Sequence, residues 1–310
     1  MQQCYSDGAV VQTCYAMLAV MLLLPGLARA DAVALSGDDY HTSLESWKAA
    51  RLASLKGPSG YLNLAGLFWL KQQQSTFGSA ADSDIVFPPA APPNIGVFQW
   101  LDGQVVLAVQ PQVIVLHEGT PVTRIRMLDD ASEAPVTVAY GSLTWTVIQR
   151  DGKFAVRLRD FDHPALRDFP GIDYYLPDTA MQVRALLEPY AVPREVRVDT
   201  VIEGLDYRPR SPGILKFLLG GEAFELEAYQ ANDQLLLIFG DQTSGYDTYP
   251  AGRFLYADQP DQDGYTMLDF NKAENPPCAF NDFATCPVAS PRNRLKTRVE
   301  AGERFDPSSH

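Results

Sequence analysis

The densest group of polar residues in the sequence lies between residues 253 and 286. Its members are Arg253, Asp269, Asn271, Lys272 and Asn275. If residues 268–271 form a strand, alternate side chains share a face, so Asp269 and Asn271 point the same way. Arg253 could pair with Asp269, or it could bind an anionic ligand. These five residues are therefore candidate ligand-binding residues, and no catalytic residue is assigned.

The same residue types suit two different roles. They could form a buried polar network that satisfies the backbone of an irregular C-terminal segment, because such segments rely on Asn and Asp side chains. Alternatively, they could line a ligand-binding or catalytic pocket. Convergence of Arg253, Asp269 and Asn271 on an open pocket would favour the second role, and a sealed network would favour the first.

Two cysteines follow in the same segment, Cys278 and Cys286, with seven residues between them. They are the only cysteines after residue 30. In an oxidising compartment we expect them to form one structural disulfide. A zinc site needs about four ligands, and the four histidines are scattered along the sequence. No metal site and no cofactor are therefore predicted.

The first 30 residues are predicted to be a signal peptide. Residues 16–27 form an apolar run of 12, which is too short to span a bilayer. Ala28-Arg29-Ala30 then matches the small-x-small pattern of a cleavage site. We expect a mature chain that begins at Asp31, is periplasmic or secreted, and has no transmembrane segment. The alternative interpretation is a buried N-terminal helix.

The composition limits the classes of partner. The chain has 310 residues, of which 46% are hydrophobic and 20% charged, as in a globular protein. Lys and Arg number 25 against 38 Asp and Glu, which gives a net charge of −13. Because an acidic surface repels phosphate backbones, nucleic-acid binding is not expected. The expected partner is a small molecule or another protein.

The elements that must position the polar residues are mostly strands. Residues 42–56 carry apolar side chains at helical spacing and predict one short helix within residues 31–60. From residue 61 onward, polar and apolar residues alternate, which is typical of antiparallel sheets with one solvent-facing side. Three dipeptides are typical of hairpin turns: Asp102-Gly103, Asp151-Gly152 and Gly220-Gly221.

The predicted fold class is mainly β, with two antiparallel units of the sandwich or barrel type after the helix. A stretch rich in proline, aspartate and glycine ends at Pro177-Asp178 and is the candidate boundary. The predicted units are a β-sandwich over residues 61–177 and a second β domain over residues 178–310. The second domain ends in an irregular segment that contains the cysteines.

Two groups of motifs resemble a bacterial family known only as domain of unknown function 1684. The first group is YLNLAGLFWL at 61–70, TFGS at 76–79 and SDIVFP at 83–88. The second group is GDQTSGYDTYPAGRFLYA at 240–257, LDFNKAENPPCAFNDFATCP at 268–287 and NRL at 293–295. The resemblance implies an architecture but no mechanism, because the family carries no established activity.

The first half also has a loose likeness to forkhead-associated domains. The matching residues are FGS at 77–79 and SDI at 83–85. The likeness implies a β-sandwich scaffold for this half. Ser79 stands where those domains carry a phosphate-binding arginine, so phosphopeptide recognition is not expected.

Common catalytic signatures are missing from the sequence. It has no Gly-x-Ser-x-Gly elbow, no His-Glu-x-x-His motif, no phosphate-binding loop and no dinucleotide fingerprint. The leading hypothesis is therefore an extracytoplasmic protein that binds a ligand or a partner. The alternative is a hydrolase-type enzyme with its site on residues 253–286.

Overall fold

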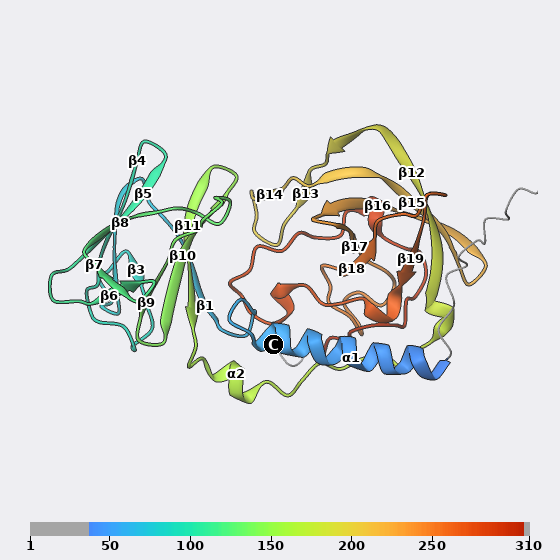
Figure 1. The fold of residues 1–310 in the computed structure, drawn as a ribbon, viewed down its shortest axis with the longest axis horizontal. Coiled ribbons are helices and arrows are strands. Elements are labelled where there is room, and N and C mark those ends of the chain that lie inside the picture. The colour runs from blue at the N-terminus through green and yellow to red at the C-terminus, as the bar shows by residue number, and fades with distance from the viewer. Residues whose placement is uncertain (1–36, 307–310) are drawn as a thin grey trace, which may run out of the picture.

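The computed structural model describes residues 37–306. Within this range the chain is mainly β, with several antiparallel sheets and one long helix, which confirms the predicted fold class. Figure 1 shows one group of strands at each end of the molecule, and the long helix runs along the lower side of the right-hand group. The predicted signal peptide and its cleavage site lie outside the described residues.

The long helix α1 spans Gly37–Lys56, so it begins five residues before the predicted start at residue 42. Asp38 and Asp39 lie in its first turn, where negative charge is favourable to the helix dipole. The helix ends before Pro58, which has no backbone N–H to continue the hydrogen-bond ladder. Tyr40, Leu44 and Leu55 are buried, so one side of α1 packs against the rest of the protein.

The first group of strands is a β-sandwich of two sheets. One sheet has the order β1 (Leu64–Trp69), β11 (Lys153–Asp160), β10 (Leu143–Arg150), β9 (Thr137–Tyr140), β6 (Val115–His117) and β7 (Thr120–Val122). The other has the order β3 (Ile85–Val86), β2 (Gln73–Gly78), β4 (Gly96–Leu101), β5 (Gln104–Val109) and β8 (Arg124–Met127). Phe77 joins the two layers, since its ring centroid lies 4.5 Å from Phe98 and 5.8 Å from Trp145.

The predicted hairpins are confirmed. Asp102-Gly103 joins β4 to β5, and Asp151-Gly152 joins β10 to β11. All four residues have positive φ, between 48° and 74°, as the tight two-residue turn of a twisted hairpin requires. Gly220-Gly221 makes the same kind of connection between β15 and β16.

The second group of strands forms one nearly closed, barrel-like sheet. Its order is β18 (Arg253–Asp258), β17 (Gln234–Phe239), β16 (Glu222–Ala231), β15 (Arg210–Leu219), β12 (Gln182–Glu195) and β19 (Tyr265–Asp269). The two outermost strands, β18 and β19, follow each other in the sequence and contact each other. Leu215, Leu226, Leu237 and Phe270 are fully buried in its core.

Short elements complete the described chain. They are α2 (Pro164–Asp168), the ribbon β13 (Val198–Asp199) and β14 (Asp206–Tyr207), and the 3-10 helices η1 (Thr179–Met181), η2 (Phe270–Lys272), η3 (Pro277–Ala279) and η4 (Pro291–Asn293). The condition considered for residues 268–271, that all four form a strand, is not met, because β19 ends at Asp269 and Asn271 lies in η2. The Asp269 carboxylate accepts from the amide of Asn271, which stabilises a turn in place of a further strand pair. The domain boundary at residue 177 stays a prediction.

Candidate functional site: a polar hollow beside helix α1

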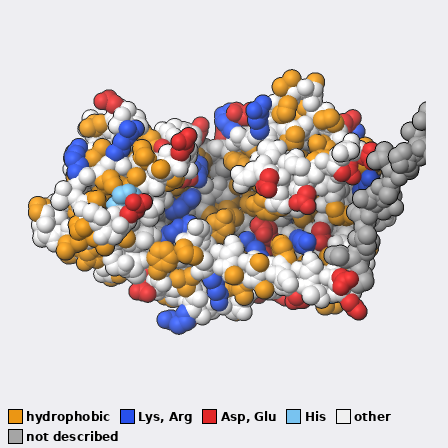
Figure 2. Space-filling model, in the orientation of Figure 1, with side chains coloured by type: hydrophobic (Ala, Val, Ile, Leu, Met, Phe, Trp, Pro, Cys, Tyr) orange, Lys and Arg blue, Asp and Glu red, His pale blue; other side chains and the backbone are white. Residues whose placement is uncertain are grey.

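A hollow of about 480 Å³ lies between α1 and the outer wall of the barrel-like sheet. Its polar and aromatic lining includes Trp47, Gln182, Tyr256, Asp258, Asp269, Lys272 and Glu274. Figure 2 shows a depression on this face, next to α1, in which side chains of both charges gather. We call this feature the polar hollow.

Strand alternation explains why polar side chains face the hollow. On β18, Leu255 and Ala257 are buried inside the barrel-like sheet, whereas Tyr256 and Asp258 are exposed on its outer wall. The Tyr256 side chain is 41% exposed, so its ring is accessible to a ligand. Gln234 fixes Asp258 by donating from Nε2 to Oδ1 at 3.0 Å.

Helix α1 is tied to this wall by an arginine shared between two carboxylates. Nε of Arg51 lies 2.8 Å from Oε1 of Glu303 and 3.2 Å from Oε2 of Glu274. The Glu303 side chain is fully buried and also accepts from the amide of Asn275 at 2.6 Å. Arg51 also donates to the carbonyl of Asn275 at 2.9 Å. Glu303 is therefore the better-satisfied carboxylate, and Glu274 has only the longer contact with Arg51.

This unequal sharing affects proton binding. Burial raises the pKa of Glu274 from its usual 4.5 to about 7, the Arg51 charge opposes the rise, and the neighbouring Glu303 adds to it. Burial also raises the pKa of Glu303, against the effect of Arg51. A carboxyl group that lines a hollow and titrates near neutral pH can donate or accept a proton.

Asp269 lies at the edge of the hollow and is extensively hydrogen-bonded. Its carboxylate accepts from the Tyr40 hydroxyl at 3.0 Å and 3.2 Å and from Nε2 of Gln182 at 3.2 Å. Burial and the Asp269 charge raise the pKa of the Tyr40 hydroxyl, so Tyr40 remains a donor. Nζ of Lys272 lies 3.6 Å from the same carboxylate.

Asn271 connects Asp269 to the chain that enters β12. Its Nδ2 donates to Asp269 at 3.2 Å and to the carbonyl of Asp178 at 2.8 Å. The amide of Asp178 donates back to Oδ1 of Asn271 at 3.0 Å. Asn271 therefore joins two segments of the fold.

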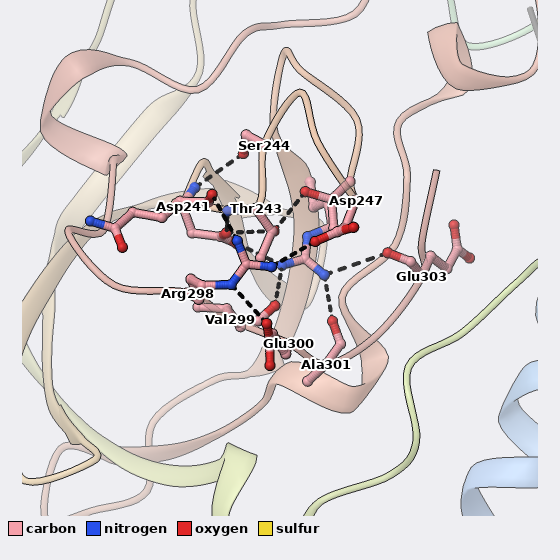
Figure 3. A network of polar contacts seen from close by, with 12 residues as sticks. Asp241, Thr243, Ser244, Asp247, Arg298, Val299, Glu300, Ala301 and Glu303 are labelled. Carbon is pink, nitrogen blue, oxygen red and sulfur yellow. Dashed lines mark hydrogen bonds and ion pairs between the residues drawn. The ribbon is translucent and has the colours of Figure 1, made fainter. Parts of the chain in front are cut away.

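Arg253 lies in a separate, sealed network. Its guanidinium donates to Oδ2 of Asp241 at 2.6 Å and to the carbonyl of Val299 at 2.9 Å, and it also contacts the carbonyls of Ala301 and Glu303. In Figure 3, Asp241, Val299, Ala301 and Glu303 converge on this network. Both charged side chains are almost completely buried. The suggested pairing of Arg253 with Asp269 is wrong, because Arg253 pairs with Asp241 and anchors the C-terminal segment.

The five predicted residues are thus divided between environments. The structure brings together Asp269, Asn271 and Lys272, and the first and third of these line the hollow. The backbone N–H of Asn275 donates to the Glu303 carboxylate. The side-chain Oδ1 of Asn275 is buried and has no hydrogen-bond partner among the described residues. Sequence reasoning missed Glu274, although it lies within the predicted polar segment. It also missed Arg51 and Trp47, which only the docking of α1 brings to this site.

Cys278 and Cys286 are adjacent in the structure as free thiols. The amide of Cys278 donates to Sγ of Cys286 at 3.1 Å. A hydrogen bond between the two side chains lowers the pKa of Cys278 and raises that of Cys286. The expected disulfide stays a prediction.

Two further findings concern residues 37–306. No set of three or more His, Cys, Asp or Glu side chains in this range is arranged to hold a metal ion. None of the helices in this range is long and apolar enough to cross a membrane.

Comparison with known proteins identifies the family of the second half. Residues 167–304 match the family described as "Protein of unknown function (DUF1684)". This range contains the motifs at 240–257 and 268–287, so the resemblance is confirmed there, and the chain belongs to this family through its second half. The match does not include residues 61–109. The bacterial origin and the likeness to forkhead-associated domains stay predictions.

Among solved structures, the chain is similar to an uncharacterised protein of Haloarcula marismortui, determined by NMR in solution. The two are 34% identical, the alignment covers 46% of this chain and 82% of the other, and the TM-score is 0.39. No curated protein matches the chain.

The raised pKa of Glu274 predicts a specific pH dependence of stability. A carboxyl whose pKa is higher in the folded state than in the unfolded state binds more protons when folded, so stability falls as pH rises from about 4.5 to about 7. Glu274→Gln should reduce this fall by on the order of 2 kcal/mol, while Glu303 retains part of it. Urea unfolding between pH 4.5 and pH 8 measures the effect.

Glu203→Gln is the matched control for this experiment, because Glu203 is exposed and lies outside the hollow. It should leave the pH dependence unchanged. An unchanged dependence in Glu274→Gln as well would contradict the prediction.

Proposed function

We propose that this protein is an extracytoplasmic ligand-binding protein whose polar hollow binds a small molecule with a cationic amine. The observation that carries the proposal is the composition of the lining. Three carboxylates, Asp258, Asp269 and Glu274, face the hollow together with one ammonium group, Lys272. The net negative charge of the whole chain acts in the same direction.

Aromatic side chains support the same ligand class. Trp47 and Tyr256 lie in the lining, and aromatic faces attract cations through their quadrupoles. Gln182 and Gln234 add amide groups for hydrogen bonds with polar substituents. Since an ionised carboxylate is the better partner for a cation, binding should strengthen as Glu274 loses its proton near pH 7.

Calorimetric titration with four probes tests the ligand class: putrescine and choline as cations, glucose as a neutral solute, and succinate as an anion. The two cations should bind, and the other two should not. Asp258→Asn and Glu274→Gln should each weaken putrescine binding by about two- to fivefold, as expected for partly exposed charge pairs. Tyr256→Ala should weaken choline binding to a similar extent.

Glu203→Gln again serves as the control and should leave putrescine affinity unchanged. Tighter binding of glucose than of either cation, or equal affinities in wild type and Asp258→Asn, would contradict the charge-based proposal.

A hydrolase is the second candidate, and the position of Glu274 is the observation that favours it. This carboxyl group faces the hollow and has a pKa of about 7, which suits a general acid or base. A panel of p-nitrophenyl esters and glycosides would reveal such an activity. The enzyme hypothesis expects turnover that follows an apparent pKa near 7 and is lost in Glu274→Gln. Turnover that persists in Glu274→Gln would exclude Glu274 from the reaction.

Export and disulfide formation belong to the same proposal. The predicted signal peptide implies a mature N-terminus at Asp31 and an oxidising destination, where Cys278 and Cys286 would pair. Mass spectrometry of protein from its native host should find Asp31 first and both cysteines unreactive until reduction. An intact N-terminus on a cytosolic protein, or two reactive thiols in exported protein, would overturn this part.

A further inference from the structure

A second pocket, distinct from the polar hollow, lies on the outer face of the larger sandwich sheet. It has a volume of about 260 Å³ and is lined by Ser59, Thr137, Thr144, Thr146, Arg157 and Arg159, among others. Thr144 is the cross-strand neighbour of Arg159, and Thr146 is that of Arg157, so two arginines and two threonines form one patch. We call this feature the arginine pocket.

Arg157 is the unusual member of this pocket. The structure gives its side chain no hydrogen bond or ion pair to any residue between 37 and 306, and its Nε is buried without a partner. The carboxylate of Asp130 is close enough for its charge to act on Arg157. Arg150 already holds that carboxylate, however, with two hydrogen bonds, at 3.1 Å and 2.7 Å. Arg157 is only partly buried, but its Nε is shielded from solvent and its charge has no partner among the described residues, so the contacts within the fold do not use its hydrogen-bonding capacity.

Arg159, by contrast, is held firmly beside it. Its Nη1 donates to Oδ1 of Asn63 at 2.5 Å and to the carbonyl of Gly60. These partners are uncharged, so the positive charge of Arg159 is oriented but not neutralised. Burial lowers the pKa of both Arg157 and Arg159, which is the direction expected for cations removed from water without a counter-charge.

The remaining lining contains no carboxylate to neutralise these charges. The hydroxyl of Thr146 donates to the carbonyl of Val136 at 3.0 Å. Thr137 and Thr144 contribute further hydroxyl groups to the lining. Ionisable groups close to Arg157 outside the lining include Arg150, Asp130, Tyr61 and the thiols of Cys278 and Cys286. The pocket is therefore a cationic, hydroxyl-lined site on a protein whose net charge is −13.

We propose that the arginine pocket binds a tetrahedral oxyanion, phosphate or sulfate, either as the free ion or as the end group of a larger molecule. Arg157 would supply the charge-assisted hydrogen bonds that it does not make within the protein. Thr144 would add a hydroxyl donor from the neighbouring strand. This site shares no lining residue with the polar hollow, so it does not depend on the cationic ligand proposed there.

The test is an NMR titration of the full-length protein with sodium phosphate, sodium sulfate and glycerol phosphate, each compared with sodium chloride at matched ionic strength. The amide signals of Thr144, Thr146 and Arg157 should shift with the three oxyanions and not with chloride. Tighter binding of glycerol phosphate than of phosphate would identify the end group of a larger molecule. Equal or weaker binding would identify the free ion.

Variants assign the binding to this pocket. Arg157→Gln should weaken phosphate binding by at least about tenfold, because it removes a charged hydrogen-bonding partner. Thr144→Val should weaken it less and provides a second variant if Arg157→Gln folds poorly. Arg210→Gln, at an exposed site on β15, is the control and should have no effect.

Stability in phosphate-free buffer gives an independent measurement. Arg157→Met should be at least as stable as wild type, because it replaces a partly buried, unpaired cation with a solvent-shielded Nε by an apolar side chain. Phosphate should then raise the melting temperature of wild type but not of this variant. Equal shifts with chloride, unchanged phosphate affinity in both pocket variants, or marked destabilisation by Arg157→Met would overturn the proposal.

Discussion

The position of helix α1 depends on the contact of Arg51 with Glu303 and Glu274. These residues lie on α1, in the C-terminal segment and just after η2, so one guanidinium joins three distant parts of the sequence. Burial of charges is costly unless each is paired and hydrogen-bonded. Arg253 also fixes the C-terminal segment that carries Glu303, because it binds Asp241 and three backbone carbonyls of residues 299–303. The two arginines together hold an irregular segment against the barrel-like sheet.

The properties of the polar hollow follow from this arrangement. Helix α1 supplies Trp47 to the lining of the hollow. Its docking also brings Nε of Arg51 to 3.2 Å from the Glu274 carboxylate. Because Glu303 has the shorter contact with Arg51, Glu274 remains incompletely compensated in a buried site. Its affinity for protons rises for that reason, and the same carboxylate becomes available to a ligand. The docking of α1 and the raised pKa of Glu274 in the hollow thus both follow from the sharing of Arg51 between two carboxylates.

Local features of the fold could be predicted from the sequence, and tertiary pairings could not. The hairpins at Asp102-Gly103 and Asp151-Gly152 depend on the backbone freedom of two adjacent residues, which the sequence displays directly. The end of β19 at Asp269 depends on a side-chain hydrogen bond that competes with the strand ladder. The partner of Arg253 depends on how β17 and β18 lie next to each other, and spacing along the chain contains no such information. Similarly, the sequence shows that residues 253–286 are rich in polar side chains. It does not show that Arg51, more than 200 residues before Glu274, contacts that segment.

Hydrogen exchange by mass spectrometry in wild type and Arg51→Met tests most directly whether this contact docks α1. Residues 37–56 should be strongly protected in wild type, since Tyr40, Leu44 and Leu55 are buried against the rest of the protein. In Arg51→Met, exchange should accelerate in α1 and around Glu274 and Glu303, while the sandwich strands keep their protection. Unchanged exchange in α1, or equal acceleration in the sandwich and in α1, would show that the Arg51 contact does not dock the helix.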